Sequence, residues 1–336
     1  MRKLGVFLLG VFLAGASAWA VSPSTDKAYA DTAEVYIGGI PAGFTFSTGG
    51  AQVLGFCDVV TENGKRSPAS EAGVRAGDLI VAINGIKVET IAEMNEILAK
   101  NGDKMLKCKV LRGEERIELS IQPSKDKGSD RYKIGVLIRD GVSGIGTVTY
   151  IDKQSGRFGA LGHAVMGEKE SPLSLTNGQM YLCNIVGVSR GLKGKAGELR
   201  GMFLAEKSLG KAEKLCTCGI YGKINEKFET KGMPTAKATA VNAKPGKASI
   251  YSTVSGEEPK EYSIEIVKVD LDQKQNKNFV IKITDEQLIE ETGGIVQGMS
   301  GSPILQNGAL VGAITHVFVN DPTRGYGIAI EQMLNQ

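Results

Sequence analysis

The segment Gly298-Met299-Ser300-Gly301-Ser302-Pro303 decides how the rest of this chain is interpreted. Its glycines permit a tight turn in which backbone N–H groups converge on one point. A serine inside such a turn is typical of a presented nucleophile, and the N–H groups of Gly298 and Ser300 would then form an oxyanion hole. An ordinary Gly/Ser turn before a strand is the alternative. Ser302, at the second small position, is a further candidate nucleophile.

A nucleophilic serine needs a neighbouring base, and imidazole suits neutral pH. The chain holds two histidines. His163 lies among small residues in segment 158–167, which leave space for a substrate backbone. His316 lies in the apolar run 312–319, which is typical of a buried strand, so we predict a core histidine there. His163 is therefore the predicted base.

A third group should orient the imidazole. Asp285 ends the alternating, strand-like segment 279–284 and precedes Ser300 by a short interval. Most acidic residues are solvated surface groups, so residue chemistry alone does not choose between Asp285 and its competitors. These competitors are Asp152, Asp270, Asp272 and Asp321.

The composition is that of a globular protein, with 42% hydrophobic and 23% charged residues among 336. Arg2 and Lys3 precede the uncharged segment 4–25, so residues 1–25 are predicted to be a secretory signal peptide or a retained membrane anchor. The net charge of +3 falls to +1 without these two cations (3 − 2), which gives no indication of nucleic-acid binding. The five cysteines lack a disulfide or metal framework and are expected to be free thiols.

Residues 33–124 are predicted to form a compact α/β module. In segment 67–85 a short helix ends at a glycine, a Gly-Asp turn starts a strand, and Asn-Gly turns the chain again. This pattern resembles a PDZ domain, which implies that an extended peptide binds by adding a strand to a sheet edge. The helix Ile91–Leu98 would line the groove. The predicted carboxylate-binding loop is Ile40, Pro41, Ala42, Gly43 and Phe44.

Residues 130–336 follow a polar segment, 125–130, that we predict to be a linker. Many short strands with glycine-rich turns indicate two packed barrels with a site in the cleft between them. The predicted fold is therefore mainly β, with an α/β PDZ module before a chymotrypsin-like double β-barrel. Residues 198–214 are expected to form a helix or a surface insertion. Strands are expected at 132–139, 146–151, 179–188, 262–269, 278–283 and 310–319, with a hairpin turn at Asn307-Gly308.

The run 294–304 resembles the peptidase of the stage IV sporulation protein B family, and so do segments 161–165, 311–323 and 325–328. The resemblance covers nearly all of the chain after residue 25. It implies a secreted serine endopeptidase of endospore-forming bacteria, with a PDZ domain before the peptidase domain. On the matching positions the family nucleophile is Ser300, its histidine is His163 and its acidic residue is Asp285.

The resemblance also implies a place of action and partners. Members of this family act between the two membranes around the forespore, where they cleave a regulatory protein that holds a membrane-embedded metalloprotease inactive. That cleavage leads to processing of sigma-K. Self-cleavage and control through the PDZ domain are further expectations, with a PDZ ligand that is a separate peptide or the chain itself. Acyl transfer by these residues needs no metal or organic cofactor. The alternative is a binding module in which the PDZ domain is functional and residues 130–336 are a non-catalytic scaffold.

Overall fold

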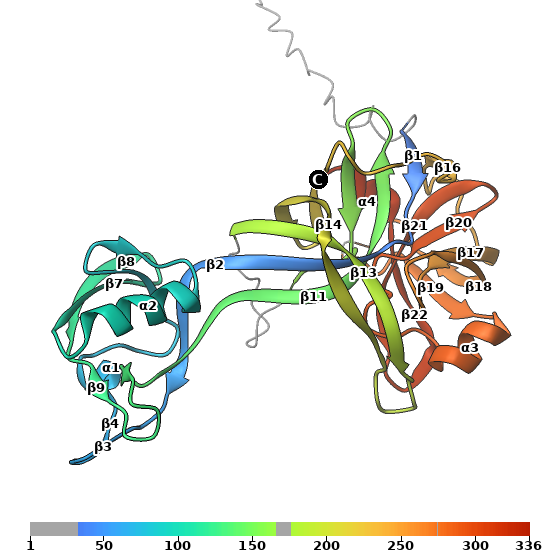
Figure 1. Cartoon of the computed structure of the whole chain (residues 1–336). Coiled ribbons are helices and arrows are strands. Elements are labelled where there is room, and N and C mark those ends of the chain that lie inside the picture. The colour runs from blue at the N-terminus through green and yellow to red at the C-terminus, as the bar shows by residue number, and fades with distance from the viewer. Residues whose placement is uncertain (1–32, 166–175, 274) are drawn as a thin grey trace, which may run out of the picture.

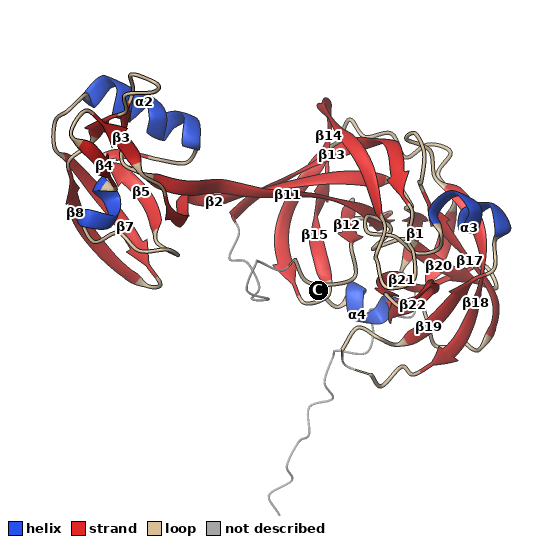
Figure 2. Ribbon diagram, turned by 90° about the horizontal axis from the view of Figure 1, so that it is seen from below, coloured by secondary structure: helices blue, strands red, loops and turns tan. Residues whose placement is uncertain are grey.

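The computed structural model describes residues 33–165, 176–273 and 275–336 of the chain. A small α/β module and a larger body of β-strands are joined by two long strands, β2 (Pro41–Phe56) and β11 (Val136–Asp152) (Figures 1 and 2). None of the helices in the described ranges is long and apolar enough to cross a membrane. The predicted leader at residues 1–25 lies outside the described residues.

Six antiparallel strands close into a first barrel, in the order β2, β11, β12, β15, β14, β13 and back to β2. Its buried core contains Phe44, Phe158, Met180 and Ile220. Within the barrel each of these strands pairs with a neighbour on both sides. The strands not yet bounded are β12 (Arg157–Ala160), β13 (Thr176–Ser189), β14 (Glu198–Cys216) and β15 (Gly219–Ile224).

Strand β14 corrects the prediction of a helix or insertion at residues 198–214. It pairs with β13 on one side and with β15 on the other. Long-range pairing of the backbone on both sides determines the conformation here, because β-structure depends on partners distant in sequence.

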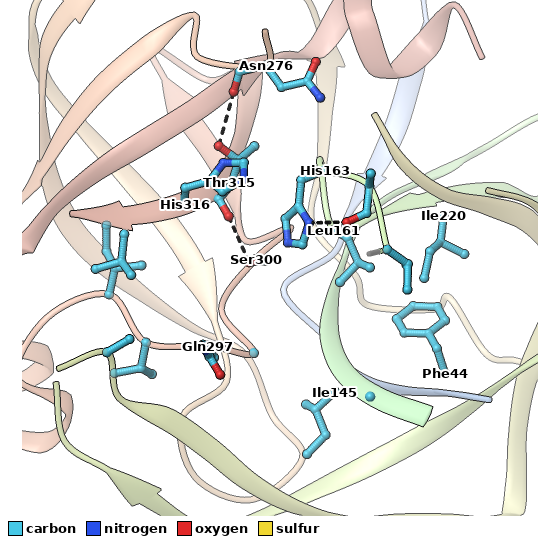
Figure 3. Close-up of a pocket in the computed structure, with 18 of the residues that line it drawn as sticks. Phe44, Ile145, Leu161, His163, Ile220, Asn276, Gln297, Ser300, Thr315 and His316 are labelled. Carbon is cyan, nitrogen blue, oxygen red and sulfur yellow. Dashed lines mark hydrogen bonds between the residues drawn. The ribbon is translucent and has the colours of Figure 1, made fainter. Parts of the chain in front are cut away.

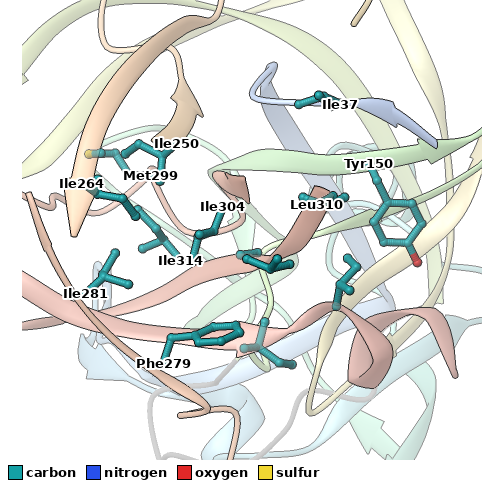
Figure 4. Packing of buried hydrophobic residues seen from close by; sticks show 14 of the residues in the cluster. Ile37, Tyr150, Ile250, Ile264, Phe279, Ile281, Met299, Ile304, Leu310 and Ile314 are labelled. Carbon is teal, nitrogen blue, oxygen red and sulfur yellow. The ribbon is translucent and has the colours of Figure 1, made fainter. Parts of the chain in front are cut away.

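A second barrel also closes with six strands, in the order β17, β18, β19, β22, β21, β20 and back to β17. Ile250, Ile264, Phe279 and Ile304 fill its interior (Figure 4). Helices α3 (Glu286–Thr292) and α4 (Ile330–Leu334) belong to this half of the chain. The strands are β17 (Gly246–Ser252), β18 (Lys260–Val269), β19 (Phe279–Ile283), β20 (Pro303–Gln306), β21 (Ala309–Phe318) and β22 (Asp321–Ala329).

Two further strands connect the barrels. β1 (Glu34–Ile37) pairs with β11 of the first barrel and with β16 (Thr235–Ala238), and β16 runs parallel to β21 of the second barrel. The predicted hairpin between β20 and β21 is confirmed. Asn307 and Gly308 have φ angles of 52° and 77°, as a two-residue hairpin turn with positive φ at both positions requires.

The PDZ module has its own core, which contains Val53, Ile80, Leu106 and Ile121. Its sheet runs β8, β7, β5, β2, β11, with the start of β11 at the edge. The predicted groove helix is present as α2 (Ile91–Asn101), and Thr90 and Glu93 form a capping box at its start. The other elements are β3 (Val59–Thr61), β4 (Gly64–Arg66), α1 (Pro68–Glu71), β5 (Leu79–Ile83), β6 (Ile86–Lys87), β7 (Leu106–Arg112), β8 (Glu115–Ile121), β9 (Ser124–Lys125) and β10 (Tyr132–Lys133).

The module boundaries differ from the predicted ranges 33–124 and 130–336. Residues 34–46 pair with barrel strands, and the PDZ core begins at Ala51 and extends to Ile134. The expected linker at 125–130 is the turn of the β9–β10 hairpin, where the Asp126 N–H donates to the Arg131 carbonyl. The predicted fold class is confirmed, but the PDZ module is inserted into the barrel domain through β2 and β11.

Candidate active site

The loop that carries Ser300 connects α3 to β20 and makes two tight internal turns. The N–H of Met299 donates to Val296, and the N–H of Ser302 donates to Met299. Gly298 and Gly301 have φ angles of +98° and +95°, a region in which residues with a Cβ are strained. The glycines of the motif therefore have the backbone role that the sequence predicts.

Gly301 also allows a close approach between the two barrels. A Cβ at this position would lie 2.1 Å from the carbonyl oxygen of Thr147 and 2.6 Å from the nitrogen of Leu161. Both of these residues belong to the first barrel. The nucleophile loop of the second barrel is thus packed directly on the backbone that leads to His163.

Two threonines of β11 bind the nucleophile loop, and the sequence analysis missed both. The N–H of Thr147 donates to the Ser300 carbonyl at 3.0 Å, and its Oγ1 donates to the Gly298 carbonyl at 2.9 Å. Thr149 Oγ1 donates to the Gly301 carbonyl at 2.7 Å. Both side chains are buried. Their signal in the sequence is two polar residues at alternate positions of the otherwise apolar segment 145–151, where a buried hydroxyl needs a partner.

The backbone N–H groups of Gly298 and Ser300 are available to a ligand. Within the described ranges neither donates a hydrogen bond to a backbone or side-chain acceptor, although the neighbouring residues 297, 299, 301 and 302 all do. Free N–H groups on such a turn are the chemistry of an oxyanion hole. Meanwhile Ser300 Oγ donates to the Thr315 carbonyl at 3.0 Å.

His163 follows β12 in a short turn in which Leu161 and Gly162 both have positive φ. Its Nδ1–H donates to the Ala164 carbonyl at 2.8 Å, which fixes the neutral tautomer with Nε2 unprotonated. Burial lowers the pKa of His163 below its ordinary 6.5, and the Ala164 carbonyl opposes that shift. The imidazole is therefore held neutral near pH 7, as a general base requires.

His316 corrects the prediction of a core histidine. It lies on the expected strand, β21, but its side chain is exposed in the pocket and its ring centroid lies 5.1 Å from that of His163. The register of β21 against β22 shifts between Ile314 and His316, which breaks the alternation that would have placed the side chain inside. Desolvation, with smaller contributions from His163 and Lys277, lowers its pKa to about 4.

Ser300, His163 and His316 line one cavity of about 840 Å³ (Figure 3). The structure therefore brings together the predicted nucleophile and base, which lie on different barrels. Ser302 does not share this cavity. It is fully buried, and its Oγ bonds Ser252 Oγ at 3.0 Å, which argues against it as the nucleophile.

Asp285 lies outside the cavity lining, and its predicted role as the group that orients His163 is corrected. Its carboxylate is the N-cap of α3, accepting from the Leu288 N–H at 3.0 Å and from the Ser263 N–H at 3.2 Å. The group that contacts the His163 ring nitrogen is the Ala164 carbonyl. None of the competing carboxylates lines the cavity either: Asp152, Asp270, Asp272 and Asp321.

The predicted carboxylate-binding loop is also placed elsewhere. Ile40 directly precedes β2, and Pro41–Phe44 are its first residues. In the first barrel Pro41–Phe44 pair with β11, and Ala42–Phe44 also pair with β13. Phe44 lines the cavity that holds Ser300. In the PDZ module, the edge strand is the start of β11, and the Ile91 N–H of α2 donates to the Asp140 carboxylate beside it. Strand addition in the PDZ module would therefore use β11.

The described residues offer little to a metal ion. No group of three or more His, Cys, Asp or Glu side chains comes together in residues 33–165, 176–273 and 275–336. All five cysteines are free thiols, and burial raises the pKa of Cys108 to about 12 and that of Cys183 to about 11.

Two closed barrels, a serine on a glycine turn from one and a neutral histidine from the other define a double-barrel serine peptidase with a PDZ module. A family model described as SpoIVB peptidase S55 matches residues 130–334, and a PDZ domain model matches residues 59–112. The chain belongs to the SpoIVB peptidase S55 family.

The curated relatives match only in part. The chain is 38% identical over 60 residues to the putative serine protease HhoA of Synechocystis sp., which is 18% of this chain and 15% of that protein. It is 37% identical over 59 residues to serine protease HTRA1 of Xenopus laevis (18% and 12%) and 29% identical over 133 residues to a putative zinc metalloprotease of Agrobacterium fabrum (38% and 34%). The chain thus spans between 12% and 34% of the length of these relatives.

Three solved structures match with low sequence identity and with TM-scores below 0.5. The inactive form of the Rv3671c protease has 13% identity and a TM-score of 0.34, covering 57% of this chain and 82% of that one. Human heparin binding protein has 11% identity and a TM-score of 0.25, covering 52% and 70%. The PDZ domain of an SdrC-like protein from Listeria monocytogenes has 21% identity and a TM-score of 0.22, covering 26% and 86%.

Proposed function

We propose that this chain hydrolyses peptide bonds by acyl transfer, with Ser300 as nucleophile and His163 as general base. The observation that carries the proposal is the shared cavity of these two residues, with the N–H groups of Gly298 and Ser300 free beside it. Nε2 of His163 would accept the serine proton and later deliver it to the leaving amine. The two free N–H groups would stabilise the oxyanion of the tetrahedral intermediate.

The serine must first leave its present hydrogen bond. Its hydroxyl donates to the Thr315 carbonyl, so rotation of the side chain precedes proton transfer to His163. Catalytic hydrogen bonds are often loose before substrate binds. Orientation of the imidazole by the Ala164 carbonyl supports a Ser–His pair. In this proposal Asp285 acts at a distance, as the cap of the helix that leads into the nucleophile loop.

We base the proposed substrate and pathway on the membership of the SpoIVB peptidase S55 family. Under this proposal the enzyme acts in sporulation, in the space between forespore and mother cell, and residues 1–25 direct its export. It cleaves a regulatory protein of a membrane-embedded metalloprotease, and itself, and so triggers sigma-K processing. A peptide, from a partner or from the chain itself, adds to the β11 edge beside α2 in the PDZ module. The position of β11 next to β2 in this sheet and the contact of α2 with Asp140 support this last part.

The test is self-processing and cleavage of an unfolded protein by the exported region. Ser300→Ala should abolish both, since loss of a triad serine typically reduces turnover by about a millionfold. Ser302→Ala is the matched control, because it removes a hydroxyl from the same loop that is buried against Ser252. Equal activity in wild type and Ser300→Ala would refute the assignment.

A further inference from the structure

The cavity at Ser300 is lined without a single formal charge among the described residues. The described lining residues include no Asp, Glu, Lys or Arg, and their polar side chains are those of Ser, Thr, Asn, Gln and the two neutral histidines. The nearby cation of Lys277 is placed over the Tyr326 ring, with 5.1 Å from Nζ to the ring centroid. A cavity of about 840 Å³ is large enough to take several side chains of a bound peptide.

The apolar walls come from both barrels and lie around the Ser300–His163 pair. The first-barrel side of the cavity is formed by Phe44, Ile145, Leu161 and Ile220, which lie to the right of and below His163 in Figure 3. Three of these four are fully or nearly fully buried: Phe44, Leu161 and Ile220. On the second-barrel side, the segment before the nucleophile supplies Ile295 and Val296, and the end of β21 with the turn after it supplies Val317 and Val319.

A peptide cut by this site must cross it in an extended form, with its scissile carbonyl at Ser300. Because both barrels line the cavity around Ser300, side chains on either side of that bond would meet its apolar walls. Apolar side chains gain roughly 25 cal/mol for each Å² removed from water. A charged side chain would lose hydration and find no opposite charge among the described lining residues, which is costly in a largely apolar environment.

We infer that the substrate of this site is a peptide segment with large apolar side chains on both sides of the cleaved bond. The inference rests on the proposed peptidase function and adds the class of substrate to it. It excludes substrates recognised by a basic or acidic residue next to the cut.

The first experiment measures binding, so that it does not depend on turnover. The Ser300→Ala chain is titrated with a fluorescent eight-residue peptide that has Leu and Phe at its centre, and with versions that carry Lys or Glu at either central position. Each charged version should bind at least about tenfold more weakly, which corresponds to about 1.4 kcal/mol. Equal affinity for charged and apolar versions would overturn the inference.

The second experiment measures cleavage of a mixed peptide library by the wild-type chain, with Ser300→Ala as the blank. Cleaved bonds should be flanked on both sides by Leu, Ile, Val, Phe or Met. Enrichment of a charged residue at either flanking position would contradict the inference while leaving the peptidase function intact. Absence of cleavage, with selective binding of apolar peptides by Ser300→Ala, would instead count against the proposed function and support the inference.

A variant pair tests the wall directly. Ile145→Glu adds a carboxylate to the first-barrel wall and should raise the relative affinity for the Lys-containing peptides by about tenfold. Val267→Glu adds the same charge at an exposed strand position outside the cavity and should leave selectivity unchanged. If both variants fold and shift selectivity equally, the wall does not select the substrate. Circular dichroism identifies a variant that fails to fold. In that case the peptide series of the first experiment decides whether the inference holds.

Discussion

Thr147 provides the most demanding test of how the two barrels make one site. Its Oγ1 donates to the Gly298 carbonyl and its N–H to the Ser300 carbonyl, so one residue of the first barrel anchors both residues whose own N–H groups are free. Thr147→Val keeps the side-chain shape and the N–H, and replaces the hydroxyl by a methyl group. The Gly298 carbonyl then loses its partner in a buried position.

The expected loss of stability is about 1–3 kcal/mol, the cost of leaving a buried polar group unsatisfied. The expected loss of kcat/KM is about 10–100-fold, because removal of an oxyanion-hole donor costs about 100–1000-fold and here the donors are shifted rather than deleted. Thr253→Val is the matched control. Thr253 is equally buried and its Oγ1 donates to the Gly39 carbonyl at 3.0 Å, outside the cavity lining.

The assay combines denaturant unfolding with kcat/KM on a peptide substrate, at a temperature where both variants are folded. Both should lose similar stability, and only Thr147→Val should lose activity beyond about tenfold. Equal activities in the two variants would show that the hydrogen bond from Thr147 to Gly298 does not position the nucleophile loop, and would refute this role of the first barrel.

Three further predictions follow from individual contacts. Asp285→Ala should lower the free energy of unfolding by about 0.5–2 kcal/mol through loss of the α3 cap, and Asp285→Asn should keep stability and activity because asparagine caps equally well. A folded Asp285→Asn variant with about 10⁴-fold lower kcat would show instead that Asp285 orients His163 as the third member of a triad. A plot of kcat/KM against pH should rise with a midpoint below pH 6.5, because burial lowers the pKa of His163 and only the neutral imidazole acts as a base. A midpoint above pH 7 would contradict this and would indicate a carboxylate that binds His163. Gly301→Ala should destabilise the chain by more than about 3 kcal/mol in chemical unfolding, because its Cβ meets the Thr147 carbonyl. Gly308→Ala, with positive φ but open space, should lose only about 1–2 kcal/mol.

The local features of this protein were predictable from sequence because each depends on neighbours a few residues away. Glycines around Ser300 predict a tight turn, Asn307-Gly308 predicts a two-residue hairpin, and the periodicity of residues 91–98 predicts the groove helix; all three are present. Such signals come from the φ angles that a residue allows and from which side chains share a face.

The positions of the site residues relative to one another were decided only by the tertiary structure. Asp285 follows a strand in the sequence, yet its carboxylate is used by the first turn of α3. Residues 34–46 precede the PDZ pattern in the sequence, yet they pair within and between the barrels. The buried threonines of β11 lie in the otherwise apolar segment 145–151, and only the tertiary structure shows that the nucleophile loop supplies their acceptors. Closing a barrel pairs strands that are far apart in the chain, and no local pattern encodes which carbonyl or carboxylate that pairing brings near a given side chain.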